Sequence, residues 1–98
     1  MVYRKGELHK GQIDREWPHQ VALRADLVSG ANFPIVDAYS RNLSRCPRGH
    51  TFMREGTYYV VYCFAVRADA KLFRDRFSGE IIDPKDRPRW PGAGRGRA

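Results

Sequence analysis

The sequence predicts an α+β fold of the ferredoxin-like type: a β-α-β-β-α-β sandwich whose four-stranded antiparallel sheet carries two helices on one face. Three observations support this prediction. The run Tyr58–Ala65 is uncharged and rich in aromatic and β-branched residues, which is typical of a central strand. The residues after it change to the 3.6-residue periodicity of an amphipathic helix. A short apolar segment then precedes Pro84.

In the central unit, both alternate sets of side chains in Tyr58–Ala65 are apolar, so this strand should be covered on both faces. Asp69 is the expected N-cap of the following helix, and Gly79 is its expected left-handed stop. Glu80–Asp83 is the expected fourth strand. The apolar stripe of the helix consists of Ala70, Phe73 and Phe77.

The first half of the chain shows the same kinds of element. Alternation in His19–Ala25 indicates the first strand, and a helix should begin at Asn32. His50–Arg54 is the second strand, joined to the third by a tight turn at Glu55 and Gly56. The first and third strands are then central, and the sheet face without helices is open to water, to an arm or to a partner. The apolar face of the first helix is expected to hold Ile35, Ala38, Tyr39 and Leu43.

The length and composition predict one domain. Residues 17–84 form it, residues 1–16 are an N-terminal arm or extended edge segment, and residues 85–98 are a disordered basic tail rich in Pro, Gly and Arg. No apolar run approaches the roughly 20 residues that cross a bilayer, and the first residues lack the apolar core of a secretion signal. We therefore expect a cytoplasmic protein without a membrane partner.

The charge is unevenly distributed. The formal net charge is +7, and residues 84–98 hold five Lys or Arg residues against one Asp, which is +4 of that total. The globular part is thus only mildly basic, and the overall charge overstates the case for nucleic acid as a partner.

No constellation predicts catalysis, a metal or a cofactor. Cys46 and His50 form a lone pair with three residues between them, whereas a structural zinc site needs four ligands. Cys46 has arginines nearby, but a Cys and a His close in sequence do not establish a catalytic dyad. Cys63 lies in the central strand and is expected to be a free thiol, like Cys46. Phosphate-binding glycine motifs are absent from the sequence. We therefore expect no enzyme, no metal and no cofactor.

The leading functional prediction is a small interaction module that binds another protein or forms a homodimer. An uncovered, tyrosine-rich sheet face would be an apolar patch that favours a partner, and a free sheet edge offers a second route. The expected interaction face consists of Trp17, Tyr58, Tyr59 and Tyr62.

The alternative is binding of RNA or another single-stranded nucleic acid. The run Thr57–Phe64, followed by a helix, resembles the RNA-recognition-motif family, which stacks bases on aromatic residues of the third strand. Tyr59 matches an aromatic position of that motif, but Val61 departs from another, and Thr57 and Tyr58 replace its basic residue and glycine. The resemblance implies stacking on Tyr59, and arginines could track the phosphates. The expected contacts are Arg41, Arg45, Arg48, Arg54, Tyr59, Arg95 and Arg97.

Overall fold

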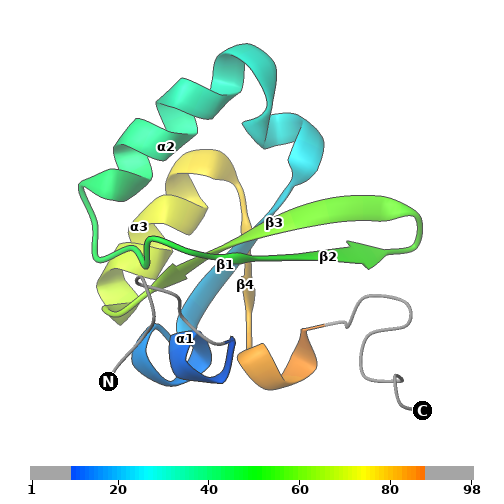
Figure 1. Ribbon diagram of the computed structural model, residues 1–98. Coiled ribbons are helices and arrows are strands. Elements are labelled where there is room, and N and C mark those ends of the chain that lie inside the picture. The colour runs from blue at the N-terminus through cyan, green and yellow to red at the C-terminus, as the bar shows by residue number, and fades with distance from the viewer. Residues whose placement is uncertain (1–9, 88–98) are drawn as a thin grey trace.

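The computed structural model describes residues 10–87, and these residues form an α+β fold with a four-stranded antiparallel sheet and three α-helices (Figure 1). The strands are β1 His19–Arg24, β2 His50–Arg54, β3 Thr57–Phe64 and β4 Glu80–Ile82. The α-helices are α1 Lys10–Glu16, α2 Phe33–Arg41 and α3 Arg67–Phe77. Short 3-10 turns are η2 Ala25–Val28, η3 Gly30–Asn32 and η4 Pro84–Asp86.

The sheet has the strand order β2-β3-β1-β4, and every neighbouring pair is antiparallel. The register pairs Ala22 with Val61 between the two central strands. The predictions that the run beginning at Tyr58 is a strand and that the first and third strands are central are confirmed. Glu55 and Gly56 both have positive φ, 52° and 79°, as the tight turn of a two-residue hairpin requires.

The two sheet faces carry separate apolar cores. Helices α2 and α3 cover one face, where Phe73 of α3 packs against Tyr62 and Phe64 with ring centroids 4.8 and 5.2 Å apart. The opposite face holds a second core of buried side chains. Its buried members are Ile13, Ala22, Cys46, Phe52, Val61, Cys63 and Ile82.

Helix α1 contributes Ile13 to the second core, with 2% of that residue exposed. The sequence predicts an arm or an extended edge segment over residues 1–16, yet Lys10–Glu16 is helical, and residues 1–9 lie outside the described part. A two-turn helix is marginal by itself, so packing of Ile13 on the sheet stabilises it. The second face is therefore partly covered by the chain's own N-terminal region.

The ends of α3 differ from the prediction. Val66 is the N-cap residue, and the carboxylate of Asp69 instead accepts a hydrogen bond from the backbone N–H of Ser44 at 2.8 Å. The left-handed residue is Ser78, with φ 57°, and not Gly79. Gly79 serves close packing, because a Cβ atom there would lie 2.5 Å from Cγ1 of Val21.

The apolar face of α2 is also rotated relative to the prediction. Val36 and Ser40 are buried, whereas Ile35 and Ala38 are exposed. The hydroxyl of Ser40 donates to the backbone oxygen of Asp37 at 2.8 Å, so a polar residue can occupy the buried side without losing hydrogen bonds. This rotation leaves Ile35, with 56% of its surface exposed, on the outside of the molecule.

Candidate functional site

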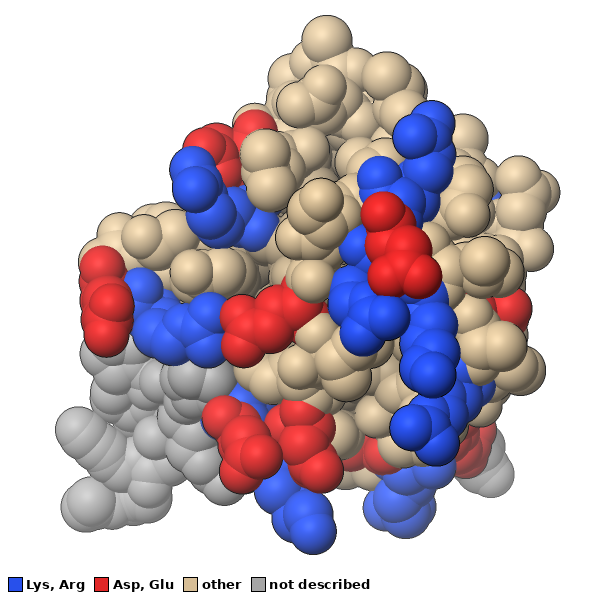
Figure 2. Space-filling model, turned by 180° about the vertical axis from the view of Figure 1, so that it is seen from behind, with Lys and Arg blue, Asp and Glu red and all other residues tan. Residues whose placement is uncertain are grey.

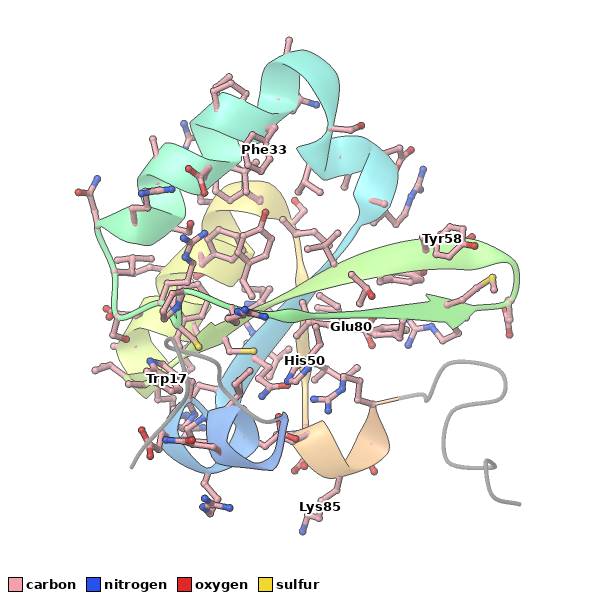
Figure 3. All side chains as sticks on the ribbon, viewed as in Figure 1. Trp17, Phe33, His50, Tyr58, Glu80 and Lys85 are labelled. Atoms are coloured by element: carbon pink, nitrogen blue, oxygen red, sulfur yellow. The ribbon has the colours of Figure 1, made fainter. Side chains whose placement is uncertain are left out.

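The expected interaction face is not one surface. Because strand side chains alternate, Tyr58 and Tyr62 lie on the helix-covered side of β3, and Tyr59 lies on the opposite side. Tyr62 is buried beneath α3 at 7% exposure, whereas Tyr58 is exposed near the hairpin end of the sheet. Trp17 packs against the second core, far from Tyr58 (Figure 3). The prediction of a shared tyrosine face is therefore wrong.

The ring of Tyr59 already has neighbours within the chain. It stacks on Phe52 with centroids 5.0 Å apart and an interplanar angle of 13°. The guanidinium carbon of Arg54 lies 4.7 Å from the centroid of the Tyr59 ring, and Arg54 also forms an ion pair with Glu80 at 2.7 Å. A base could stack on Tyr59 only by displacing one of these contacts.

The predicted arginine cluster is partly neutralised by one carboxylate. Asp37 accepts from Nε of Arg41 at 2.8 Å and from Nη1 of Arg45 at 3.1 Å. The hydrogen bond from Arg41 holds the pKa of the Asp37 carboxyl below its ordinary value, so the carboxylate stays charged. Arg48 is exposed in the loop before β2. The last two predicted contacts, Arg95 and Arg97, lie outside the described residues.

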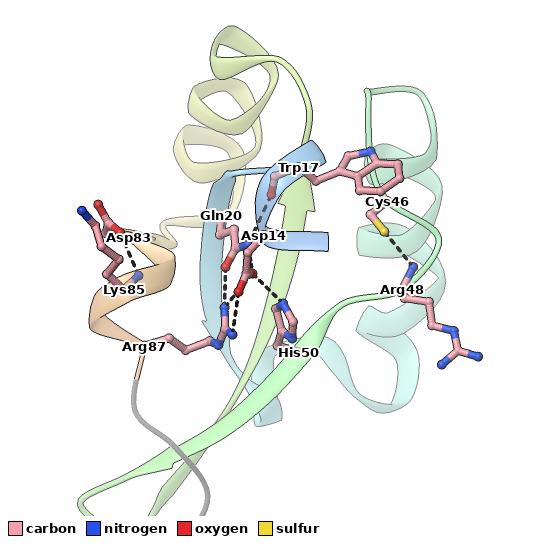
Figure 4. Close-up of polar contacts among 9 residues, drawn as sticks. All are labelled: Asp14, Trp17, Gln20, Cys46, Arg48, His50, Asp83, Lys85 and Arg87. Atoms are coloured by element: carbon pink, nitrogen blue, oxygen red, sulfur yellow. Dashed lines mark hydrogen bonds and ion pairs between the residues drawn. The ribbon is translucent and has the colours of Figure 1, made fainter. Parts of the chain in front are cut away.

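A polar network at the second face joins four segments of the chain (Figure 4). The carboxylate of Asp14 in α1 accepts hydrogen bonds from Arg87 at 3.1 and 3.2 Å and from Nε2 of Gln20 at 2.8 Å. His50 Nε2 lies 3.0 Å from the same carboxylate, and only 2% of the His50 side chain is exposed. Arg87 also donates to the side-chain oxygen of Gln20 at 2.9 Å.

The polar network around Asp14 has a structural role. Gln20, His50 and Arg87 all contact the carboxylate of Asp14, which connects α1 to β1, to the start of β2 and to the residue after η4. Burial raises the pKa of the Cys46 thiol, and Cys46 Sγ accepts a hydrogen bond from the backbone of Arg48 at 3.4 Å. A buried thiol with a raised pKa is a poor nucleophile. The arrangement holds these segments of the chain together.

Sequence reasoning missed this network entirely. Asp14 and Arg87 are 73 positions apart, and no local pattern links them. Arg87 also lies in the predicted disordered tail, where residues 85–87 are instead part of the folded structure. Both flanking segments hold several charged residues, and nothing in the sequence identifies which of them pair.

Residues 10–87 contain neither a metal-ligand cluster nor a membrane-spanning helix. Among residues 10–87, no three His, Cys, Asp or Glu side chains come together in a way that could hold a metal ion. In the same range, no helix has the length and apolar character needed to cross a membrane. Cys46 and Cys63 are both buried and are not joined in a disulfide.

An apolar surface lies where η2 meets the start of α2. We call Leu27 and Ile35, which are 43% and 56% exposed, the apolar corner. They flank a hollow of about 200 Å³ whose other lining residues include Val36 and Phe77. No residue that lines this hollow is charged, although 30% of the chain is. The lining is Leu23, Leu27, Asn32, Ile35, Val36 and Phe77.

Comparisons with known proteins do not assign a family. No protein-family model matches the sequence, and neither the curated proteins nor the solved structures include a significant match.

Proposed function

We propose that the protein is a small non-enzymatic interaction module that pairs with a second copy of itself through the apolar corner. The observation that carries the proposal is the exposure of Leu27 and Ile35 around an uncharged hollow. Contiguous exposed apolar surface favours a partner, because association removes it from water. This surface replaces the open sheet face expected from the sequence, which α1 partly covers.

Charge supports a second copy as the occupant. A net charge of +7 makes copies of the chain repel each other at long range. A two-fold symmetric contact brings the same patch of both molecules together, so charged residues at its centre would meet like charges. The lining of the hollow avoids this repulsion because it contains no charged side chain.

The free energy that each residue of the apolar corner contributes to dimerisation is modest. Burying a Leu or Ile side chain completely contributes about 1.5–3 kcal/mol, and half-exposed side chains recover about half of that. Two copies of Leu27 and Ile35 supply part of the free energy of a weak dimer. Residues around the apolar corner have to supply the rest of the free energy of dimerisation.

The experiment compares the molar mass of the wild-type protein and of Ile35→Asp by light scattering at about 100 µM, a concentration suited to weak dimers. The wild-type protein is expected to be dimeric and Ile35→Asp monomeric, because the new carboxylates would face each other in an apolar contact. Val66→Asp is the matched control. Val66 is 49% exposed and lies at the opposite end of α3 from Phe77, and Asp is favourable at its N-cap position. A monomeric wild-type protein, or a dimer that Ile35→Asp leaves intact, would overturn the proposal.

We also infer that the fold follows the ferredoxin-like order β-α-β-β-α-β. Support comes from the position of α2 between β1 and β2 and of α3 between β3 and β4 along the chain. The central places of β1 and β3 and the packing of α2 and α3 on the same core agree with that order. Helix α1 is then an addition before the first strand.

Binding of nucleic acid remains the alternative function, with less support from the geometry. The exposed Arg48 favours it, whereas Arg41 and Arg45 share the carboxylate of Asp37 and Tyr59 is stacked within the chain. Anisotropy of a labelled single-stranded RNA, measured at low and high salt with the wild-type protein and Tyr59→Ala, tests the stacking version directly.

A further inference from the structure

A groove runs between α3 and β4, and its lining residues lie toward the opposite ends of α3 and β1 from those of the apolar corner's hollow. Its volume is about 310 Å³. Arg67, Lys71 and Arg74 of α3 line one wall, and Ala70 and Ile81 are among its apolar lining residues. Figure 2 shows a column of Lys and Arg side chains with acidic side chains among them, beside a surface on which uncharged and acidic side chains are mixed.

The basic wall follows from the helical repeat. Arg67, Lys71 and Arg74 are spaced four and three residues apart, so they project from one face of α3. Within residues 10–87, neither Arg67 nor Lys71 has a carboxylate within ion-pair distance, and Arg74 pairs only with the exposed Asp75 at 3.0 Å. Asp83 is the single acidic residue of the lining. The groove therefore attracts anionic groups.

The other wall is a strand with a free side. Among the strands of residues 10–87, β4 pairs with β1 alone and lies at the edge of the sheet. Pro18, His19 and Gln20, at the start of β1, also line the groove, so it spans the ends of β1 and β4. It lies next to the outer edge of β4, where backbone N–H and C=O groups can pair with an added strand.

We propose that this groove binds an extended acidic segment of another protein, which adds to the sheet beside β4. Main-chain hydrogen bonds to an edge strand supply affinity, and alternate side chains of the added strand supply specificity. The side chains that face α3 would be Asp or Glu for Arg67 and Lys71, with an apolar residue against Ile81, which is 44% exposed. The groove is separate from the apolar corner, so each proposal stands without the other.

A polypeptide fits the groove better than a nucleic acid. His19 is the one lining residue with an aromatic ring, and the lining contains no Phe, Tyr or Trp, whereas stacking on such rings supplies much of the affinity for single strands. A phosphodiester backbone also cannot continue the hydrogen-bond ladder of β4. The basic wall alone would suit both ligands, so the experiment includes both.

The test uses the full chain and a fluorescein-labelled peptide of about eight residues, the length of an ordinary strand, in which Glu and Val alternate. Fluorescence anisotropy is expected to show binding that weakens as salt is raised, whereas a peptide with Lys in place of Glu does not bind. Lys71→Glu should weaken binding about tenfold, because an exposed attraction becomes a repulsion. Arg48→Glu is the matched control, since it makes the same charge change at an exposed residue outside the groove.

Amide hydrogen exchange locates the bound peptide. Exchange in Glu80–Ile82 should slow when the glutamate peptide binds, and Ile35→Asp should leave the affinity unchanged.

Absence of binding at about 0.1 M salt overturns the proposal, as does equal loss of affinity in Lys71→Glu and Arg48→Glu, which would indicate nonspecific attraction. Binding without slower exchange in β4 overturns strand addition. Tighter binding of labelled oligouridylate, lost in Lys71→Glu, would instead make the groove a nucleic-acid site. Far-UV circular dichroism verifies that both variants are folded.

Discussion

Asp14 and His50 are 36 positions apart in the sequence, and their side chains meet at 3.0 Å between the helix before the sheet and the start of an edge strand. With Gln20 and Arg87, they connect four segments of the chain around one carboxylate. The Asp14 side chain is 25% exposed and the His50 side chain 2%. This network adds polar contacts to the apolar packing that holds α1 on the sheet.

Asp14→Asn is expected to lower the free energy of unfolding by about 1–3 kcal/mol, because Arg87 and His50 lose a charged acceptor and remain partly buried. Urea denaturation followed by circular dichroism measures this change. Asp75→Asn is the matched control, since its carboxylate is 68% exposed and its one ion-pair partner among residues 10–87 is Arg74. The control should change stability by about 0.5 kcal/mol or less. Equal stability losses in the two variants would contradict a structural role for Asp14.

The contribution of Asp14 should depend on pH. Burial acts to raise its pKa, but the hydrogen bonds from Arg87 and Gln20 outweigh burial and hold the pKa below its ordinary value of 3.8. A carboxyl with a lowered folded-state pKa stabilises the fold above its unfolded-state pKa, and this stability is lost as the pH falls through the folded-state value. The stability difference between the wild-type protein and Asp14→Asn should therefore shrink below a pH of about 4. Urea titrations at several pH values measure it, and a constant difference would count against this assignment.

Gly79→Ala should destabilise the protein by about 1–3 kcal/mol, because overpacking a closed contact forces the neighbours apart. The added methyl group would lie 2.5 Å from Val21 Cγ1 and 2.9 Å from Leu23 Cδ2, both in the core beneath α3. Gly11→Ala, in α1, is the control. Its nearest atom would be a side-chain nitrogen of Arg15 at 3.8 Å, and Ala favours a helix over Gly. Thermal unfolding should show a lower midpoint for the first variant and an unchanged or higher one for the second.

Both cysteines should resist modification in the folded protein. Burial raises the pKa of Cys63 to about 12 and also raises the pKa of Cys46, so little thiolate is present near neutral pH. The thiolate is the reactive form, and both sulfur atoms are shielded from solvent. A chromogenic thiol reagent should therefore react slowly with the native protein and rapidly with two thiols after denaturation. Rapid native reaction of either cysteine would show that the second core opens readily.

Local patterns were sufficient for most of the secondary structure. The uncharged run around Val60 and Val61 has the composition of a strand whatever surrounds it, and Glu55 and Gly56 favour a tight turn by their own conformational preferences. The stripe of Ala70 and Phe73 likewise identified the buried face of α3. In each case, the deciding interactions lie within a few residues of one another.

The candidate sites depended on contacts that no local pattern contains. Asp69 has the right position for a helix cap but pairs with the backbone of Ser44, 25 positions away. Ile35 fits an apolar helical face but lies outside, because Val36 and Ser40 occupy the side of α2 that meets the sheet. The groove beside β4 exists because α3 packs across the sheet next to a strand that pairs, within the described part of the chain, with β1 alone.

By itself, the sequence determined where the strands and helices of residues 19–82 lie and which strands are central, because backbone preferences and apolar periodicity act over short distances. Only the tertiary structure decided that Lys10–Glu16 folds as a helix on the second face and that Tyr58 and Tyr59 point to opposite sides. It also decided that Gln20, His50 and Arg87 all contact the carboxylate of Asp14. These outcomes depend on which segments, far apart in the sequence, pack together and exclude water. The packing of the whole chain determines this.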